Sequence, residues 1–384
     1  MRIGIMADGY IDERGTVDYL KIILRGLYLH KDTQVYMFFP SENERRFRHY
    51  PPLFRRIYEK VSSYQRNTAI DEFAEFKGLS ILEYRPSKLK ALIKENHIDV
   101  IFPCMMDLGK RMPIKWAVEF FDFQHKYYPQ YFSLRTRIGR EIYFNSAAKH
   151  ADMVFVNSQD AKKDVCKFCN IDASRVEVLP FCASLGHDII GNDLNGIPQK
   201  YGVDKPYFLI SNQFYNHKRH DVAFRALKQV RDKGADVSIV CTGLMDEVPE
   251  LMKSLQALCV ELGIERDVKM LGLIPKKDQI ELMKNAISVI QPSEFEGDCS
   301  GQIIDAITIG QRVIASDIDV IKEVSFYENI VYFKLNNIDE LAERMMTLIN
   351  TPYTRPSYEE LIKKEEDYSN AFSNVIYRLV TKLV

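Results

Sequence analysis

The sequence lacks any apolar run approaching the ~20 residues that a membrane-spanning helix needs. It begins with MRIGI at residues 1–5, a pattern typical of a strand, which leaves no room for a signal peptide. Its formal net charge is only −1, so it has no general excess of the positive charge that nucleic-acid binders use. We therefore expect a cytoplasmic protein with no nucleic-acid partner.

Cysteine is sparse and does not form a metal-binding pattern. Seven cysteines are scattered over 384 residues, and an odd number in a long chain favours reduced thiols in the cytoplasm. Cys166 and Cys169 form one Cys-x2-Cys pair, but no second pair accompanies it. Buried or idle thiols are therefore a better interpretation than a metal site.

The composition that is present fits a two-domain globular protein. Hydrophobic residues make up 46% of the chain and charged residues 27%, and a length of 384 residues favours two domains of ordinary size. Strand-like and helical patterns alternate in both halves, as in a parallel, doubly wound α/β sheet. We place the first domain at 1–184, a linker at 185–206, the second domain at 207–355 and a mostly helical segment at 356–384.

Two polar loops of the second domain each follow a hydrophobic strand and precede a helix. The first loop, 212–220, follows the strand 207–211 and carries Lys218. The second, 292–302, follows the strand 288–291 and carries Glu294, Glu296 and Gly297. In an open parallel sheet such loops meet at the carboxyl ends of the strands, where ligands bind. A cation, a helix N-terminus and carboxylates together suit a nucleotide diphosphate and the hydroxyls of its sugar.

These two loops resemble the donor-binding half of the retaining family-4 glycosyltransferases, which have the GT-B fold. The family has an Arg-x4-Lys pair after the first strand of its second domain, and here Gln213 and Lys218 occupy those positions. It also has a Glu-x7-Glu motif, and here Glu296 and Asp305 are separated by eight residues. The Pro-Ser before the acids, the Gly310 turn and the residues 315–317 also match the family.

The resemblance implies a GT-B fold of two Rossmann-like domains facing a central cleft. The first domain would bind the acceptor and the second the donor, and the segment 356–384 would cross back to the first domain. Lys218 would neutralise the leaving diphosphate, and Glu296 would orient the donor sugar. The further donor-binding positions are Gly15, Gln213, Ile274, Glu294, Gly297, Ser300, Gly301 and Asp305. Gln213 carries no charge, so leaving-group stabilisation should be weaker unless Arg219 or His217 compensates.

A second group of candidate residues lies in the first domain, between Phe121 and Pro129. In the family an Asp-x-x-His followed by Tyr/Phe-Pro occupies the cleft wall at this place. The resemblance therefore makes His125 a catalytic candidate that could donate to the donor sugar or stabilise charge. Asp122 and Tyr127 are the acceptor or cleft candidates. The alternative for His125 is an ordinary structural histidine.

One Asp-x-Asp sequence, Asp317-Ile318-Asp319, has the pattern of a metal-binding pair. In the family this place is the Ser-Asp loop after a strand, and GT-B enzymes need no metal there. The resemblance therefore implies a metal-independent transfer with no cofactor besides the donor.

The expected function is retaining transfer of a hexose from a UDP- or GDP-sugar to a cell-envelope or polysaccharide acceptor, glycan or lipid-linked. One alternative is a non-catalytic nucleotide-sugar-binding protein of a polysaccharide assembly complex. Another is a different GT-B enzyme, such as an epimerase. A phosphorylase fits less well, because no lysine context for bound pyridoxal phosphate is evident. The oligomeric state stays open.

A basic segment interleaved with aromatic residues lies at 45–60. It contains five arginines and a lysine together with phenylalanines and tyrosines: Arg45, Arg46, Arg48, Arg55, Arg56, Lys60, Phe47, Tyr50, Phe54 and Tyr58. Such segments bind anionic membrane surfaces, although a solvated helix face is the preferred alternative. We expect weak, salt-sensitive association with the inner face of the cytoplasmic membrane.

Overall fold

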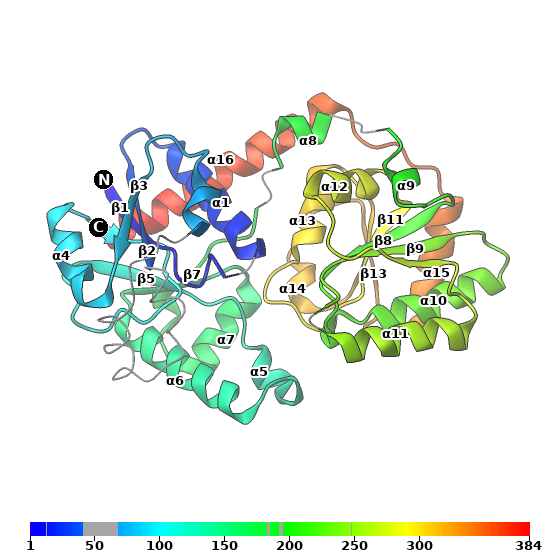
Figure 1. Ribbon diagram of the computed structural model, residues 1–384, viewed down its shortest axis with the longest axis horizontal. Coiled ribbons are helices and arrows are strands. Elements are labelled where there is room, and N and C mark those ends of the chain that lie inside the picture. The colour runs from blue at the N-terminus through cyan, green and yellow to red at the C-terminus, as the bar shows by residue number, and fades with distance from the viewer. Residues whose placement is uncertain (13, 41–67, 183–184, 192–194, 247) are drawn as a thin grey trace. The chain divides into compact units, whose positions relative to one another are not determined.

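The computed structural model describes residues 1–384 except 13, 41–67, 183–184, 192–194 and 247. The chain divides into two compact units (Figure 1). Unit 1 comprises Met1–Pro180 and Ser369–Val384, and unit 2 comprises Phe181–Tyr368. The segment 185–206, expected to be a linker, is part of unit 2 and contains the short helices α8 (His187–Gly191) and α9 (Ile197–Lys200). The basic segment 45–60 lies outside the described residues.

Unit 1 contains a seven-stranded parallel sheet in the order β3-β2-β1-β4-β5-β6-β7. Its strands are short apolar runs whose residues are largely buried, as expected where helices cover both faces of a sheet. The strands are β1 (Arg2–Met6), β2 (Gln34–Pro40), β3 (Ser80–Tyr84), β4 (Val100–Ile101), β5 (Lys115–Glu119), β6 (Met153–Val156) and β7 (Val176–Val178).

Helices pack on both faces of this sheet (Figure 1). They are α1 (Arg14–Tyr28), α4 (Leu89–Glu95), α6 (Leu134–His150) and α7 (Gln159–Cys169). The connections contain the short helix α5 (Gln124–Tyr127), after β5, and the 3-10 turns η1 (Thr68–Phe73), η2 (Pro86–Lys88), η3 (Pro129–Tyr131) and η4 (Ala173–Arg175). Helices α4, α6 and α7 share one core with the strands through residues such as Ile93, Phe144 and Val165.

The opposite face of this sheet is covered by α1 and by the end of α16 (Tyr358–Leu383). A Cβ added at Gly26 of α1 would lie 3.0 Å from Ile376 of α16, so the absence of a side chain permits this close approach. The Ser373 hydroxyl donates a hydrogen bond to the Gly26 carbonyl at 2.6 Å. The last part of the chain, from Ser369, therefore belongs to unit 1, while the first part of α16 belongs to unit 2.

Unit 2 contains a six-stranded parallel sheet in the order β10-β9-β8-β11-β12-β13. The strands are β8 (Tyr207–Ser211), β9 (Ser238–Thr242), β10 (Val268–Met270), β11 (Ser288–Gln291), β12 (Val313–Ser316) and β13 (Ile330–Phe333). The chain therefore runs outward from β8 in one direction and returns at β11 to continue in the other. The change of direction between β8 and β11 is the topological switch point, the place where such sheets bind ligands.

Two sets of helices enclose the sheet of unit 2. On one face α10 (His220–Asp232), α11 (Pro249–Leu262) and α15 (Ile338–Asn350) share a core with the strands. On the other face the core includes α12 (Lys276–Asn285), α13 (Gly301–Thr308) and α14 (Asp319–Lys322). Both units are thus Rossmann-like, doubly wound sheets, which confirms the predicted fold class. Among the described residues, no helix combines the length and the apolar character that crossing a bilayer requires.

Candidate active site

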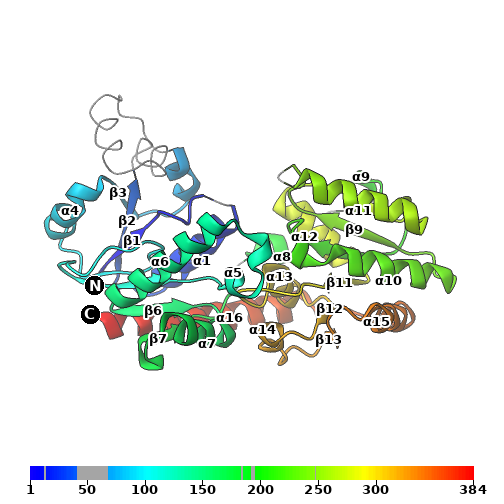
Figure 2. The same cartoon turned by 90° about the horizontal axis from the view of Figure 1, so that it is seen from below.

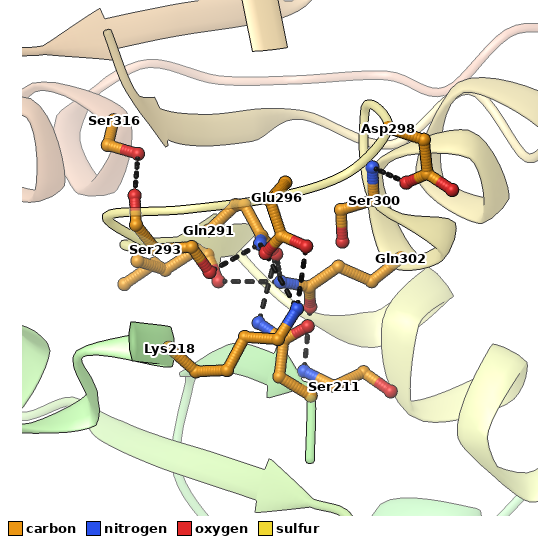
Figure 3. Close-up of polar contacts among 11 residues, drawn as sticks. Ser211, Lys218, Gln291, Ser293, Glu296, Asp298, Ser300, Gln302 and Ser316 are labelled. Atoms are coloured by element: carbon orange, nitrogen blue, oxygen red, sulfur yellow. Dashed lines mark hydrogen bonds and ion pairs between the residues drawn. The ribbon is translucent and has the colours of Figure 1, made fainter. Parts of the chain in front are cut away.

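A buried ion pair lies at the switch point of unit 2. Lys218 ends the short turn η5 (Asn216–Lys218) after β8, and Glu296 lies in the loop after β11. The Lys218 Nζ is 2.7 Å from both carboxylate oxygens of Glu296 (Figure 3). The two side chains are only 14% and 8% exposed. The structure therefore brings together two of the residues expected to be catalytic.

A network of hydrogen-bonded side-chain amides holds the Glu296 carboxylate. Gln291, the last residue of β11, donates from Nε2 to Glu296 at 2.6 Å and to the Ser293 hydroxyl at 2.7 Å. The Gln291 Oε1 accepts hydrogen bonds from Asn212 and Gln302. Every polar position of the Gln291 amide is therefore used, and the carboxylate is held in one orientation. These amides were not predicted; a polar glutamine closing the apolar strand 288–291 is the signal that could have revealed them.

The turn before α13 places another carboxyl group near the pair. Asp298 accepts a hydrogen bond from the Ser300 N–H at 2.7 Å (Figure 3). Burial, followed by the charge of Glu296, raises the pKa of Asp298 to about 6. Ser300 has a φ of +72°, uncommon for a residue with a side chain, and α13 begins at Gly301. The longer acidic motif is thus accommodated in a tight turn that leads directly into the N-terminus of this helix.

The other acidic candidates of unit 2 are paired with different cations. Asp305, in the middle of α13, forms an ion pair with Lys276 at the start of α12. Glu294 is 3.1 Å from the Arg219 guanidinium, which also binds Asp221. Asp305 therefore remains a candidate for the ribose hydroxyls only together with Lys276, which the sequence did not single out.

Gln213 links two loops at the carboxyl edge of the sheet. Its Oε1 accepts a hydrogen bond from the Leu244 N–H, in the loop after β9, at 2.8 Å. The neighbouring Gly243 has a φ of +152°, and a Cβ there would lie 2.2 Å from the Asn212 carbonyl oxygen. The two loops thus touch through their backbones. The amide of Gln213 holds the loop after β9, a task that the arginine of the family could not perform because it has no acceptor.

The neighbours His217, Arg219 and His220 add no uncommitted positive charge beside Lys218. Burial, with the nearby charge of Lys218, lowers the pKa of His217 to about 3, so this ring is neutral near pH 7. His220 is completely buried, stacks on Phe214 at 4.6 Å between ring centroids, and also has its pKa lowered to about 3 by burial. Arg219 is already engaged with Asp221 and Glu294. Neither Arg219 nor His217 therefore compensates for the missing arginine.

We expect the exchange Gln213→Arg to lower sugar transfer rather than raise it. Arginine cannot accept the hydrogen bond of the Leu244 N–H, so the loop after β9 would lose its anchor. Gln213→Glu keeps the acceptor and should retain much more activity. The measurement is kcat and KM for the donor with both variants at equal folded fraction. A Gln213→Arg protein as active as wild type would show that the hydrogen bond between Leu244 and Gln213 is not needed for activity.

The candidates of unit 1 lie together around α5, at the carboxyl end of β5. His125 is buried, and its Nε2 lies 3.0 Å from Glu141 of α6. Burial is the main cause that lowers the pKa of His125. Asp122 is 2.6 Å from Arg140, and the Tyr127 hydroxyl donates to Asp164. A role of His125 at the donor sugar stays a prediction.

Gly15, expected near the donor phosphates, lies in the first turn of α1. A Cβ added there would meet no atom within 4 Å. The local structure of unit 1 therefore does not require a glycine at this position. Its proposed approach to a ligand stays a prediction.

A buried carboxylate at the end of β5 was not predicted from the sequence. Glu119 is 1% exposed and accepts hydrogen bonds from the hydroxyls of Tyr10 and Tyr19. The Tyr19 oxygen in turn accepts from Asn157, which follows β6, at 2.7 Å. The network ties the loop after β1 and the helix α1 to the strand ends of unit 1. An acidic residue closing an apolar strand was the available signal.

The residues with metal-ligand patterns have other contacts. The Asp317 carboxylate accepts from the Leu335 N–H at 2.9 Å. Asp319 is exposed and lies 3.9 Å from the Lys322 ammonium. Cys166 and Cys169 are free thiols. Within the described parts of the chain, no group of three or more His, Cys, Asp or Glu side chains is arranged to hold a metal ion.

Two protein families match this chain. Residues 197–367 match the glycosyl transferases group 1, and residues 27–182 match glycosyltransferase family 4. The first match contains the Lys218–Glu296 pair and the second contains His125. Among curated protein sequences, none matches the chain.

Solved structures of similar fold cover essentially the whole chain. HepE from Anabaena, solved with UDP and glucose, has a TM-score of 0.67 and 16% identity over 100% of this chain and 99% of its own. Sucrose-phosphate synthase from Thermosynechococcus elongatus has a TM-score of 0.68 and 15% identity with the same coverage. WaaG, a glycosyltransferase involved in lipopolysaccharide biosynthesis, has a TM-score of 0.59 and 13% identity over 100% of both chains. These similarities establish a shared fold.

Proposed function

Because the chain is a glycosyltransferase of the family-4 type with the GT-B fold, we propose that it transfers a hexose from a UDP- or GDP-sugar to a glycan or lipid-linked acceptor of the cell envelope, with retention of configuration. The observation that carries the donor assignment is the buried Lys218–Glu296 pair at the switch point of unit 2. HepE was solved with UDP-glucose, which supports a nucleotide sugar as the donor.

The chemistry of the pair suits a leaving nucleotide diphosphate. Lys218 is the cation of the pair, and the N-terminus of α13 adds partial positive charge close to Glu296. When a diphosphate reaches Lys218, the lysine gains a doubly charged partner and Glu296 becomes available to accept from sugar hydroxyls. Because both groups are largely buried, their interactions with a ligand are less screened by water than surface contacts would be.

The test is release of nucleotide diphosphate from a panel of UDP- and GDP-sugars, with and without glycan acceptors. We expect one donor to release its nucleotide, faster when an acceptor is present. The anomeric configuration of the product, read by NMR, tests retention. Failure of every donor in the panel to release nucleotide would contradict the proposed reaction.

We propose that the transfer needs no divalent metal. The support is that Lys218 can take the leaving-group role that a metal fills elsewhere. Activity is therefore expected to persist at full rate in excess chelator. The measurement is nucleotide release before and after EDTA treatment, followed by addition of Mg²⁺ or Mn²⁺. Loss of activity with EDTA and its rescue by either ion would contradict metal independence and direct attention back to Asp317 and Asp319.

A second candidate function is nucleotide-sugar binding without transfer, within a polysaccharide assembly complex. Two observations favour it: Lys218 is already neutralised by Glu296, and Gln213 is bonded to Leu244. Leaving-group stabilisation would then rest on a single lysine. Tight binding of a nucleotide sugar with no turnover, in the donor panel above, would select this function over transfer.

A further inference from the structure

Helix α6 of unit 1 carries a row of exposed aliphatic side chains. Leu134, Ile138 and Ile142 are 67%, 51% and 66% exposed. They are spaced by four residues, so they lie on one side of the helix. The other side packs into the core through Phe144 and Ala147. The helix thus presents an apolar strip on its outer side in addition to its core side, which is unusual for a surface helix.

The same stretch concentrates positive charge. Between residues 126 and 149 there are five basic residues and one acidic residue, Glu141, in a chain whose net charge is −1. The basic residues are Lys126, Arg135, Arg137, Arg140 and Lys149. Lys126 pairs with Glu141, and Arg140 pairs with Asp122. Arg135, Arg137 and Lys149 form no ion pair with any described residue, and Arg135 and Lys149 are exposed. We call the strip with these three cations the α6 surface.

The neighbouring helix α7 does not cancel this charge. Helix α6 lies beside α7 on one face of the sheet (Figures 1 and 2). On α7, Lys162, Lys163 and Lys167 outnumber Asp160 and Asp164. Of these two acids, Asp160 lies 3.5 Å from Lys163 and Asp164 accepts from the Tyr127 hydroxyl.

We propose that the α6 surface docks on an anionic lipid bilayer. Aliphatic side chains flanked by arginine and lysine are the pattern of a helix that lies in the plane of a membrane interface. The three cations favour a negatively charged partner. A two-fold contact with a second copy would place the same cations against each other, which is unfavourable. Three aliphatic residues make a small apolar contact, so the binding is reversible and sensitive to salt.

The direction of α6 relates this docking to the ligand-binding edge of the sheet in unit 1. In a parallel βαβ unit the helix begins at the carboxyl edge of the sheet, where ligands bind. Leu134 is therefore at the end of the α6 surface nearest that edge. A bilayer on the α6 surface would bring the edge close to lipid headgroups and so to a lipid-linked acceptor. This use rests on the proposed function, whereas the docking itself does not.

The test is co-sedimentation of the full chain with phosphatidylglycerol-containing vesicles at low ionic strength. The variant Leu134→Ser/Ile138→Ser/Ile142→Ser should lower the bound fraction at least about fivefold, because both the apolar contact and the orientation of the cations are lost. A matched control, Leu29→Ser/Val260→Ser/Phe326→Ser, changes residues that are 53%, 63% and 62% exposed elsewhere and should bind as wild type does. Circular dichroism checks that each variant is folded.

Three results would overturn the docking: no binding of wild type to these vesicles, equal binding of the α6 variant and wild type, or a wild-type dimer by light scattering that the α6 variant converts to a monomer. The second result, combined with loss of binding when Arg45, Arg46, Arg48, Arg55 and Arg56 are changed to serine, would assign the membrane contact to the segment 45–60. Release of nucleotide from the donor without acceptor should be the same in wild type and the α6 variant. Vesicle binding with no nucleotide release would contradict the proposed function and leave the docking intact.

Discussion

Replacing Lys218 by alanine is expected to lower kcat/KM for sugar transfer by about 10²–10³-fold, the usual effect of removing one group that stabilises developing charge. Among the described residues, Lys218 is the one cation that forms an ion pair with Glu296. Gln213 is neutral and bonded to Leu244, so no second charge takes over the role. The measurement is nucleotide release under saturating and limiting donor.

A control separates loss of chemistry from loss of folding. Lys218→Ala alone leaves Glu296 buried beside Gln291 without its cation, which costs stability. The double variant Lys218→Ala/Glu296→Gln removes that buried charge and should recover much of the melting temperature, but not the activity. Recovery of both would mean that Lys218 acts only through the stability of the loop.

Replacing Gly243 by alanine is expected to destabilise unit 2 by about 3 kcal/mol, because the cost of overpacking is added to the cost of a strained backbone. The new Cβ would lie 2.2 Å from the Asn212 carbonyl oxygen, so one of the two loops must move. That movement would also displace Gln213 and reduce donor binding. The measurements are the urea midpoint of unit 2 and the donor KM at a temperature where the variant is folded.

Gly234→Ala is the matched control for this prediction. Gly234 also has a positive φ, of +89°, but a Cβ there would meet nothing within 4 Å. Its cost should be about 1 kcal/mol, that of the backbone conformation alone. If the two substitutions lower the free energy of unfolding equally, the close contact between the loops after β8 and β9 does not contribute to stability.

The fold could be predicted because its signals are local. Short apolar runs alternating with helical patterns specify parallel strands covered by helices, and the predicted strands 207–211 and 288–291 coincide with β8 and β11. The structure also brings Lys218 and Glu296 together, since loops at the carboxyl ends of adjacent strands must meet. The helices within the segment 185–206 could not be predicted in the same way, because α8 and α9 are too short to show a helical period.

The partners within the site could not be predicted from the sequence. Spacing places Gln213 and Asp305 at the edge of the sheet, but it does not say which atoms their side chains reach. The hydrogen bond from Leu244 to Gln213 depends on the geometry of two loops, and the pair between Asp305 and Lys276 depends on how α13 packs beside α12. Glu119 was missed for a related reason: the phenols of Tyr10 and Tyr19, which allow its burial, are about a hundred residues away in sequence.

The central claim is that Lys218 binds the diphosphate of the donor, and calorimetric titration tests it most directly. The Glu296→Gln protein and the Lys218→Ala/Glu296→Gln protein differ only in the lysine. Each would be titrated with UDP and uridine, or with GDP and guanosine, according to the donor that the panel identifies. We expect the diphosphate to improve affinity over the nucleoside by about tenfold or more in the first protein, and this gain to be mostly lost in the second. An equal gain in both proteins would contradict the claim.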